Sequence, residues 1–89
     1  MPARPLNVIG SQLRRLRYER GLSQPALAAA CQRAGWDVSR DTVANIEGHR
    51  RWVADFELLF LSRVLKVPVS ELLPGSSQVT RVLKRLAAG

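Results

Sequence analysis

The amino-terminal part of the chain carries an apolar pattern with helical spacing. Ile9, Leu13 and Leu16 fall at i, i+4 and i+7, which places them on one face of a helix and leaves the polar residues between them on the other. A first helix is therefore predicted over residues 8–20, ending at Gly21. Residues 1–7 hold two prolines and little to bury, which indicates a loose arm.

A second helix and a turn follow directly. Ser23 is a preferred N-cap residue, and Pro25 is well tolerated in a first helical turn. A helix is therefore predicted from residue 24 to about residue 34, with Gly35 ending it. Cys31, on the same face as Leu27, is predicted to be a small core residue.

The third predicted helix, capped by Ser39, has one apolar and one polar side. Val43 and Ile46 lie three residues apart and are expected to be buried. A helix that enters the major groove needs groups on its other side that read base edges. That side carries Arg40, Asp41, Ala44 and Asn45. The exit from the helix adds the phosphate-seeking side chains His49, Arg50 and Arg51.

A fourth helix, predicted over residues 56–65 with Asp55 as N-cap, is apolar on two sides. Leu58, Leu61 and Leu65 form the face expected to enter the core. The opposite face needs separate cover, because an exposed apolar patch marks an interface. It consists of Phe56, Phe60 and Val64.

The carboxy-terminal part is predicted to hold one helical turn after Pro68, a linker over residues 75–78 and a final amphipathic helix. We expect the apolar side of this helix to meet the uncovered face of the fourth helix, in the same chain or across a dimer. A membrane-surface or calmodulin-type segment is the alternative, but so short a helix is marginal alone. The apolar side consists of Val79, Val82, Leu83 and Leu86, and the basic side of Arg81, Lys84 and Arg85.

These patterns predict an all-α fold, a bundle of five helices that contains a helix-turn-helix, followed by a carboxy-terminal amphipathic helix. The expected organisation is an arm over residues 1–7, a helix-turn-helix domain over residues 8–75, and a helix for packing or dimerisation over residues 76–89.

Composition narrows the class of partner. The 89 residues have a formal net charge of +7 and a pI near 11.3, which favours a polyanion such as nucleic acid. Arginine supplies twelve of the fourteen cations; it suits bidentate contact to phosphate or guanine, although genomic base composition produces the same bias. The apolar run of residues 58–61 is far too short to span a membrane, and no signal peptide is evident. A cytoplasmic location and no membrane partner are expected.

The sequence offers little for catalysis or metal binding. One cysteine and one histidine make a zinc site improbable, and no activated nucleophile, phosphate-binding glycine loop or acid/base pair is evident. We expect no enzymatic activity, no cofactor and no metal.

Three stretches together resemble a known family. They are IGSQLRRLR at 9–17, GLSQPALA at 21–28 and VSRDTVANIE at 38–47, and in this order they are similar to the lambda-repressor-like, Cro/XRE-type helix-turn-helix domain. The resemblance implies that Arg17 and Glu47 form an ion pair between the first and third helices. It further implies DNA contacts from Gln24, Ser39, Arg40, Asp41, Thr42, Ala44 and Asn45.

The sequence departs from that pattern at two places. About five extra residues, 33–37, lengthen the second helix and the turn, as in the POU-specific branch of the superfamily, and residues 52–55 replace a commoner Pro-Ser cap.

Several individual roles stay open. Asp41 either accepts from cytosine or caps its own helix, and Asn45 either reads bases or is a solvated polar residue. His49 is expected to be exposed or phosphate-contacting. Trp36 and Trp52 are expected to pack against helices, with base stacking as the alternative.

The predicted function is a sequence-specific double-stranded DNA-binding transcriptional regulator, repressor-like and of bacterial or phage type, acting as a homodimer on a palindromic site. An antitoxin or restriction-modification controller is the alternative among DNA-binding proteins. A protein-interaction adaptor with a helix-turn-helix that does not read DNA is the alternative from another class.

Overall fold

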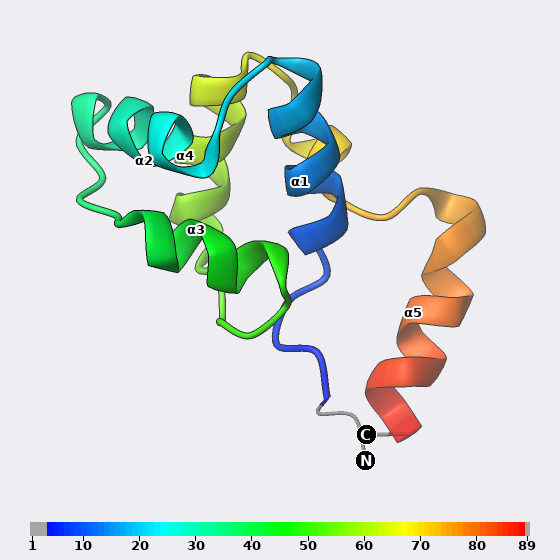
Figure 1. The fold of residues 1–89 in the computed structure, drawn as a ribbon. Helices are drawn as coiled ribbons and strands as arrows, with labels where there is room; N and C mark the ends of the chain where they lie inside the picture. Colours follow the sequence, from blue (N-terminus) through cyan, green and yellow to red (C-terminus); the bar gives the residue numbers. More distant parts are fainter. Residues whose placement is uncertain (1–3, 89) are drawn as a thin grey trace.

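The computed structural model describes residues 4–88, and all secondary-structure elements within them are helical (Figure 1). Five α-helices and one 3-10 turn follow one another: α1 (Gly10–Glu19), α2 (Gln24–Arg33), α3 (Arg40–Glu47), α4 (Asp55–Leu65), η1 (Val69–Leu72) and α5 (Ser76–Ala88). The predicted all-α class is confirmed, and the single helical turn predicted after Pro68 is η1. Residues 1–3 of the predicted arm and Gly89 of the predicted last helix lie outside the described residues.

The bundle is built around α2 and α3, which pack on each other. Helix α1 packs on α3 and η1, while α4 packs on α2 and η1. The amphipathic pattern explains this arrangement, because each helix turns its apolar stripe inward. The core residues are Ile9, Leu13, Leu16, Leu27, Ala28, Cys31, Val38, Val43, Ile46, Leu61, Leu65 and Leu72.

Local capping sets the ends of the two central helices. Ser23 Oγ accepts from Ala26 N–H at 3.1 Å, and Ser39 Oγ accepts from Thr42 N–H at 3.1 Å, so both predicted N-caps are present. Gly35, with φ +107°, turns the chain after α2 in a conformation that side-chain-bearing residues rarely adopt.

Helix α4 begins differently from the prediction. Asp55 is its first helical residue, and the N-cap is Ala54. The backbone N–H of Ala54 donates to Glu57 Oε1 at 2.9 Å, so the carboxylate of Glu57 satisfies the cap in place of Asp55.

The segment before α1 is anchored to the bundle. Asn7 Oδ1 accepts from Gly10 N–H at 2.9 Å, while Asn7 Nδ2 donates to the carbonyls of Ile46 and Arg51, both at 3.0 Å. Leu6 N–H also donates to the His49 carbonyl at 2.9 Å. The prediction of a loose arm is therefore wrong for this segment, because one amide side chain joins the start of α1 to the end of α3.

Helix α5 stands beside the bundle (Figure 1). None of its residues is fully buried; Val82 and Leu86 are half-buried, while Val79 and Leu83 are exposed. It begins at Ser76, so the predicted linker over residues 75–78 is wrong: Gln78 Oε1 accepts from Gly75 N–H at 3.3 Å within the first turn.

Candidate nucleic-acid interface

Helix α3 presents one buried and one solvent-facing side. Val43 and Ile46 are 1% and 0% exposed, whereas Arg40, Asp41 and Asn45 are exposed on the other side. The buried side fixes the helix on α1 and α2, so its polar side is held at the surface without any need for a partner.

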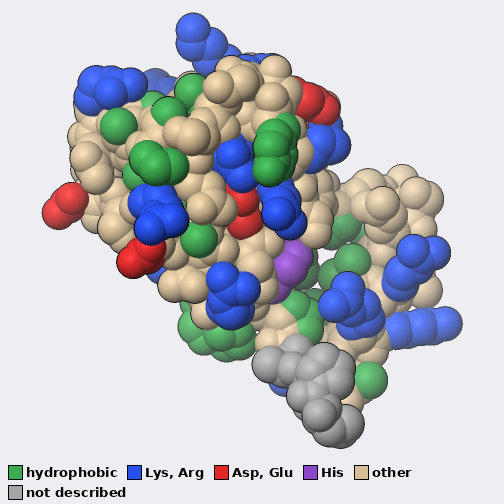
Figure 2. Space-filling view, in the orientation of Figure 1, with side chains coloured by type: hydrophobic (Ala, Val, Ile, Leu, Met, Phe, Trp, Pro, Cys, Tyr) green, Lys and Arg blue, Asp and Glu red, His purple; other side chains and the backbone are tan. Residues whose placement is uncertain are grey.

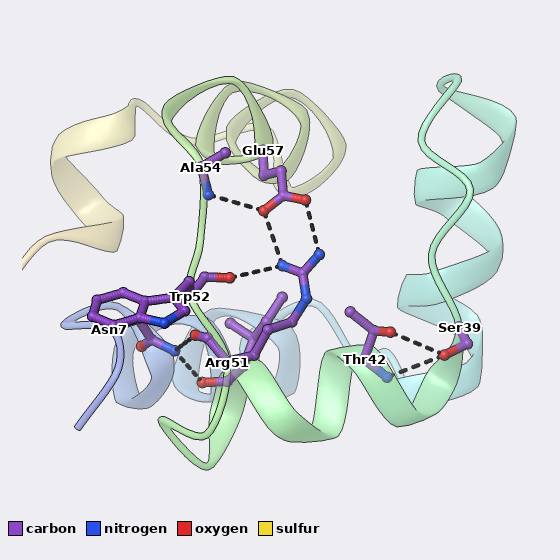
Figure 3. A network of polar contacts seen from close by, with 8 residues as sticks. Asn7, Ser39, Thr42, Arg51, Trp52, Ala54 and Glu57 are labelled. Atoms are coloured by element: carbon purple, nitrogen blue, oxygen red, sulfur yellow. Dashed lines mark hydrogen bonds and ion pairs between the residues drawn. The ribbon is translucent and has the colours of Figure 1, made fainter. Parts of the chain in front are cut away.

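The first turn of α3 divides its polar groups between capping and solvent. Ser39 and Thr42 are engaged with each other, with their hydroxyls 3.1 Å apart, as Figure 3 shows. Arg40 Nε lies 3.3 Å from Asp41 Oδ1, with the side chains 61% and 83% exposed. An ion pair this exposed is weak, so Arg40 is free to exchange Asp41 for an external acceptor.

A buried ion pair fastens α3 to α1. Arg17 Nε donates to Glu47 Oε2 at 2.6 Å and Arg17 Nη2 to Glu47 Oε1 at 3.0 Å, with the side chains 6% and 4% exposed. The hydrogen bonds to Glu47, together with its negative charge, raise the pKa of Arg17, with burial opposing them. The ion pair implied by the family resemblance is thus present.

Gln24 joins the same network. Its Nε2 donates to Glu47 Oε1 at 3.1 Å, and Arg17 Nη1 donates to the Leu22 carbonyl at 2.8 Å. The start of α2, the end of α1 and the end of α3 therefore meet on one carboxylate. Gln24 was predicted to contact DNA; in this arrangement one of the two N–H groups of its amide donates to Glu47, and the DNA contact stays a prediction.

His49 is half-buried at the exit from α3. Its Nδ1 lies 3.0 Å from the Asn7 carbonyl, which can only accept, so this nitrogen carries the proton. Its Nε2 lies 3.2 Å from Ser11 Oγ. The ring is half-buried and not exposed as predicted, because it bridges the segment before α1 to the end of α3. Its contact to phosphate stays a prediction.

The two arginines after His49 differ in their surroundings. Arg50 is exposed and returns to the end of α3, where its Nε donates to Asn45 Oδ1 at 3.3 Å. Arg51 turns toward α4, and its Nη1 and Nη2 donate to the two oxygens of Glu57 at 2.9 Å and 3.0 Å (Figure 3). This pairing, opposed by burial, raises the pKa of Arg51 and lowers that of Glu57.

Arg51 therefore has a structural role in its pair with Glu57, and its predicted contact to phosphate stays a prediction. The Glu57 carboxylate, 9% exposed, neutralises the guanidinium and also caps α4. Arg50 remains the exposed cation of the exit segment.

The apolar face of α4 is only partly exposed. Phe56 is 58% exposed, but Phe60 stacks on Trp36 with ring centroids 5.9 Å apart. Val64 packs against the core, so its place on an uncovered face is corrected. Trp36 packs as predicted, whereas Trp52 is 71% exposed and the packing expected for it is wrong.

Helix α5 does not cover this face within the chain. The hollow beside Phe56 and Phe60 is lined by residues of 34–68, while Val82 and Leu86 of α5 line hollows next to residues 4–12. The expected contact between the two apolar faces is thus not made in one chain, and contact across a dimer stays a prediction.

Sequence reasoning missed two residues that shape this surface. Asn7 and Glu57 hold the exit of α3 from either side. An Asn shortly before a helical pattern is a recognisable capping signal, and a Glu three residues after a loop residue is typical of a capping box.

The described part of the chain lacks a cluster of metal ligands and a membrane-spanning helix. Among residues 4–88, no three His, Cys, Asp or Glu side chains lie together as metal ligands would. No described helix has both the length and the apolar character that crossing a bilayer requires.

Comparison with known protein families gives a match over most of the chain. A family model described as a helix-turn-helix domain matches residues 8–74, which include every element from α1 to η1. No curated protein and no solved structure matches.

Proposed function

The chain belongs to the helix-turn-helix domain family, and we propose that it is a sequence-specific, double-stranded DNA-binding transcriptional regulator of the Cro/XRE type. The observation that carries this proposal is the division of α3, with Val43 and Ile46 buried and Arg40, Asp41 and Asn45 facing solvent. A helix fixed from behind with donors and acceptors in front suits the major groove, whose base edges such side chains can read.

Each polar residue of α3 has a distinct part in the proposal. Arg40 reads guanine, because its partner among the described residues is the exposed Asp41, which an external acceptor can replace. Asn45 reads adenine or orients Arg50, which donates to it. Ser39 and Thr42 orient the first turn through their mutual hydrogen bond.

Binding sites selected from random duplex DNA provide the test. Arg40→Ala should weaken binding to the selected site by about 1–3 kcal/mol and relax the preference at one base pair. The matched control is Arg63→Ala, which removes an exposed cation from α4 and should affect selected and random DNA alike. If Arg40→Ala loses the same affinity for selected and for random DNA, Arg40 contacts only phosphate. A wild-type protein without sequence preference would refute the proposal.

We further propose that the protein acts as a repressor-like homodimer on a palindromic site. Exposed apolar side chains remain on α4, where Phe56 and Leu59 are 58% and 62% exposed, and on α5, where Val79 and Leu83 are 39% and 58% exposed. Contact between α4 of one protomer and α5 of its partner would cover both sets, since neither is covered within the chain.

Sedimentation tests the dimer. Phe56→Glu and Leu83→Glu place charges at sites exposed in the monomer, so each should shift the protein toward monomer with little change in monomer stability. Each should also weaken palindrome binding more than half-site binding, because a dimer spans half-sites about 34 Å apart. A wild-type protein that is monomeric at high concentration and binds palindromes as tightly as Leu83→Glu would contradict this proposal.

The exposed Phe56 and Leu59 also fit a protein-interaction adaptor that does not read DNA. Competition with heparin separates the two functions, because an adaptor would show no preferred genomic fragment after the challenge.

A further inference from the structure

A hollow of about 220 Å³ separates α5 from the rest of the protein. On the α5 side it is lined by Gln78, Arg81 and Arg85. Facing them are Ser11, Gln12 and His49, which belong to α1 and to the exit from α3. The hollow therefore lies between the last helix and the end of α3, the candidate DNA-reading helix.

The hollow has a one-sided charge. Its lining includes two arginines and no aspartate or glutamate, and α5 itself has no acidic residue. The ion pairs between residues 4–88 all lie outside α5. Two exposed guanidinium groups without an acidic neighbour in the lining favour a bound anion, and their planar donors match phosphate oxygens.

The position of the hollow indicates where such an anion comes from. A recognition helix contacts base edges with its N-terminal residues, so the opposite end of α3 (Arg40–Glu47) leans toward the phosphates that border the groove. The segment after α3, which includes His49, therefore lies near the backbone when α3 is inserted. Figure 2 shows basic side chains of α5 on the same face of the molecule as those of the main body.

We propose that Arg81 and Arg85 bind a phosphate of the DNA backbone next to the segment read by α3. This inference rests on the proposed DNA-binding function and extends the binding surface to a helix outside the matched helix-turn-helix domain. The Gln12 amide supplies an additional donor to the same phosphate, while the Ser11 hydroxyl donates to His49 Nε2. Binding also fixes α5, which its own packing holds only through half-buried residues.

The test compares three charge-removing substitutions on one helix. Arg81→Gln and Arg85→Gln alter the hollow, while Lys84→Gln removes the same charge from a side chain that does not line it. A phosphate contact contributes about 0.9 to the slope of log K against log salt, which corresponds to roughly eight-fold in affinity at 0.1 M salt. We expect a loss of this size for each bound protomer, with a shallower slope, for the double variant Arg81→Gln/Arg85→Gln and a much smaller change for Lys84→Gln.

Duplex length locates the contact. A duplex that ends at the base pairs read by α3 should bind wild type and double variant equally, whereas a duplex extended on the flanking side should show the difference. Thermal unfolding of the variants should be unchanged, because all three side chains are exposed.

Inorganic phosphate distinguishes the backbone from a small anionic ligand as the source of the group. Amide NMR signals of Ser11, Gln12 and His49 should move little in phosphate and strongly with extended duplex. Strong saturable shifts with phosphate alone, or equal losses for Lys84→Gln and the double variant, would overturn the proposal. If the DNA affinity of the wild type does not depend on salt, both this inference and the proposed function are wrong. If that affinity depends on salt but Lys84→Gln and the double variant lose it equally, this inference alone is wrong.

Discussion

Removal of Glu47 offers the sharpest test of how α3 is held. Glu47→Ala leaves the Arg17 guanidinium, 6% exposed as a side chain, without the acceptors at 2.6 Å and 3.0 Å. Among residues 4–88, the Leu22 carbonyl at 2.8 Å remains as its hydrogen-bond acceptor, and the Tyr18 ring centroid lies 4.6 Å from its Cζ. Gln24 Nε2 also loses its acceptor. Breaking a buried pair from one side costs about 3–5 kcal/mol, because a buried charge is left uncompensated.

This cost is large for a small domain. Domains of 60–100 residues lose about 4–8 °C in Tm per kcal/mol, so Glu47→Ala should lower Tm by at least about 12 °C. Urea unfolding should give the same loss with an unchanged m-value. DNA binding should weaken as well, since the end of α3 loses its attachment to α1.

The chain contains a matched control on the same helix. On α1, the helix of Arg17, Arg15 Nη1 lies 2.9 Å from Glu19 Oε2, but both side chains are 50% exposed. Glu19→Ala should therefore cost about 1 kcal/mol or less. Similar small losses for Glu47→Ala and Glu19→Ala would refute the argument that burial makes the first pair important. The double variant Arg17→Met/Glu47→Met should recover much of the loss, because replacing a buried pair by apolar residues is often neutral.

Three other predictions follow from single sites. Because Arg51 lowers the pKa of Glu57, their pair stabilises the fold fully above the ordinary glutamate pKa of about 4.3. This contribution is lost as pH falls through the lower pKa that Glu57 has in the folded protein. The free energy of unfolding of Glu57→Gln, measured by urea titration between about pH 6 and 3, should therefore depend less on pH than that of the wild type. Gly10→Ala would place a Cβ 2.5 Å from a backbone carbonyl oxygen of α3 and should lower the free energy of unfolding by about 1–3 kcal/mol. At Gly75 a Cβ meets no atom within 4 Å, so Gly75→Ala should change that free energy by no more than about 0.5 kcal/mol. Denaturant unfolding of both variants measures the difference. Burial raises the pKa of Cys31 to about 11, so a thiol reagent at neutral pH should react only after denaturation, and rapid labelling of the native protein would contradict the buried placement.

The sequence by itself determined the helices and most of the core. Ser23 and Ser39 cap helices through contacts within three residues, and Leu13 and Ile46 occupy apolar stripes whose period is visible along the chain. Such features depend on neighbours in sequence, so local chemistry is enough to predict them. The partner of Arg17 is thirty positions away, and only the family resemblance supplied it.

The tertiary structure decided the roles of the charged and amphipathic residues. In sequence, Arg50 and Arg51 are equivalent cations after a helix, yet one is exposed and the other is held by Glu57. His49 likewise acquires its role from Asn7, 42 positions away. The direction of a side chain depends on how elements distant in sequence pack, which no local pattern contains.

Helix α5 shows the same limit on a larger scale. Its apolar and basic sides follow from its period, but the pattern does not say which surface lies opposite. The prediction paired its apolar side with Phe56 and Phe60, whereas the fold places Val82 near α1 and directs Arg81 and Arg85 to a hollow beside the exit of α3. The position of α5 follows from the short connection after η1 and from the packing of residues 4–12. That position determines which cations of α5 lie on the surface near α3.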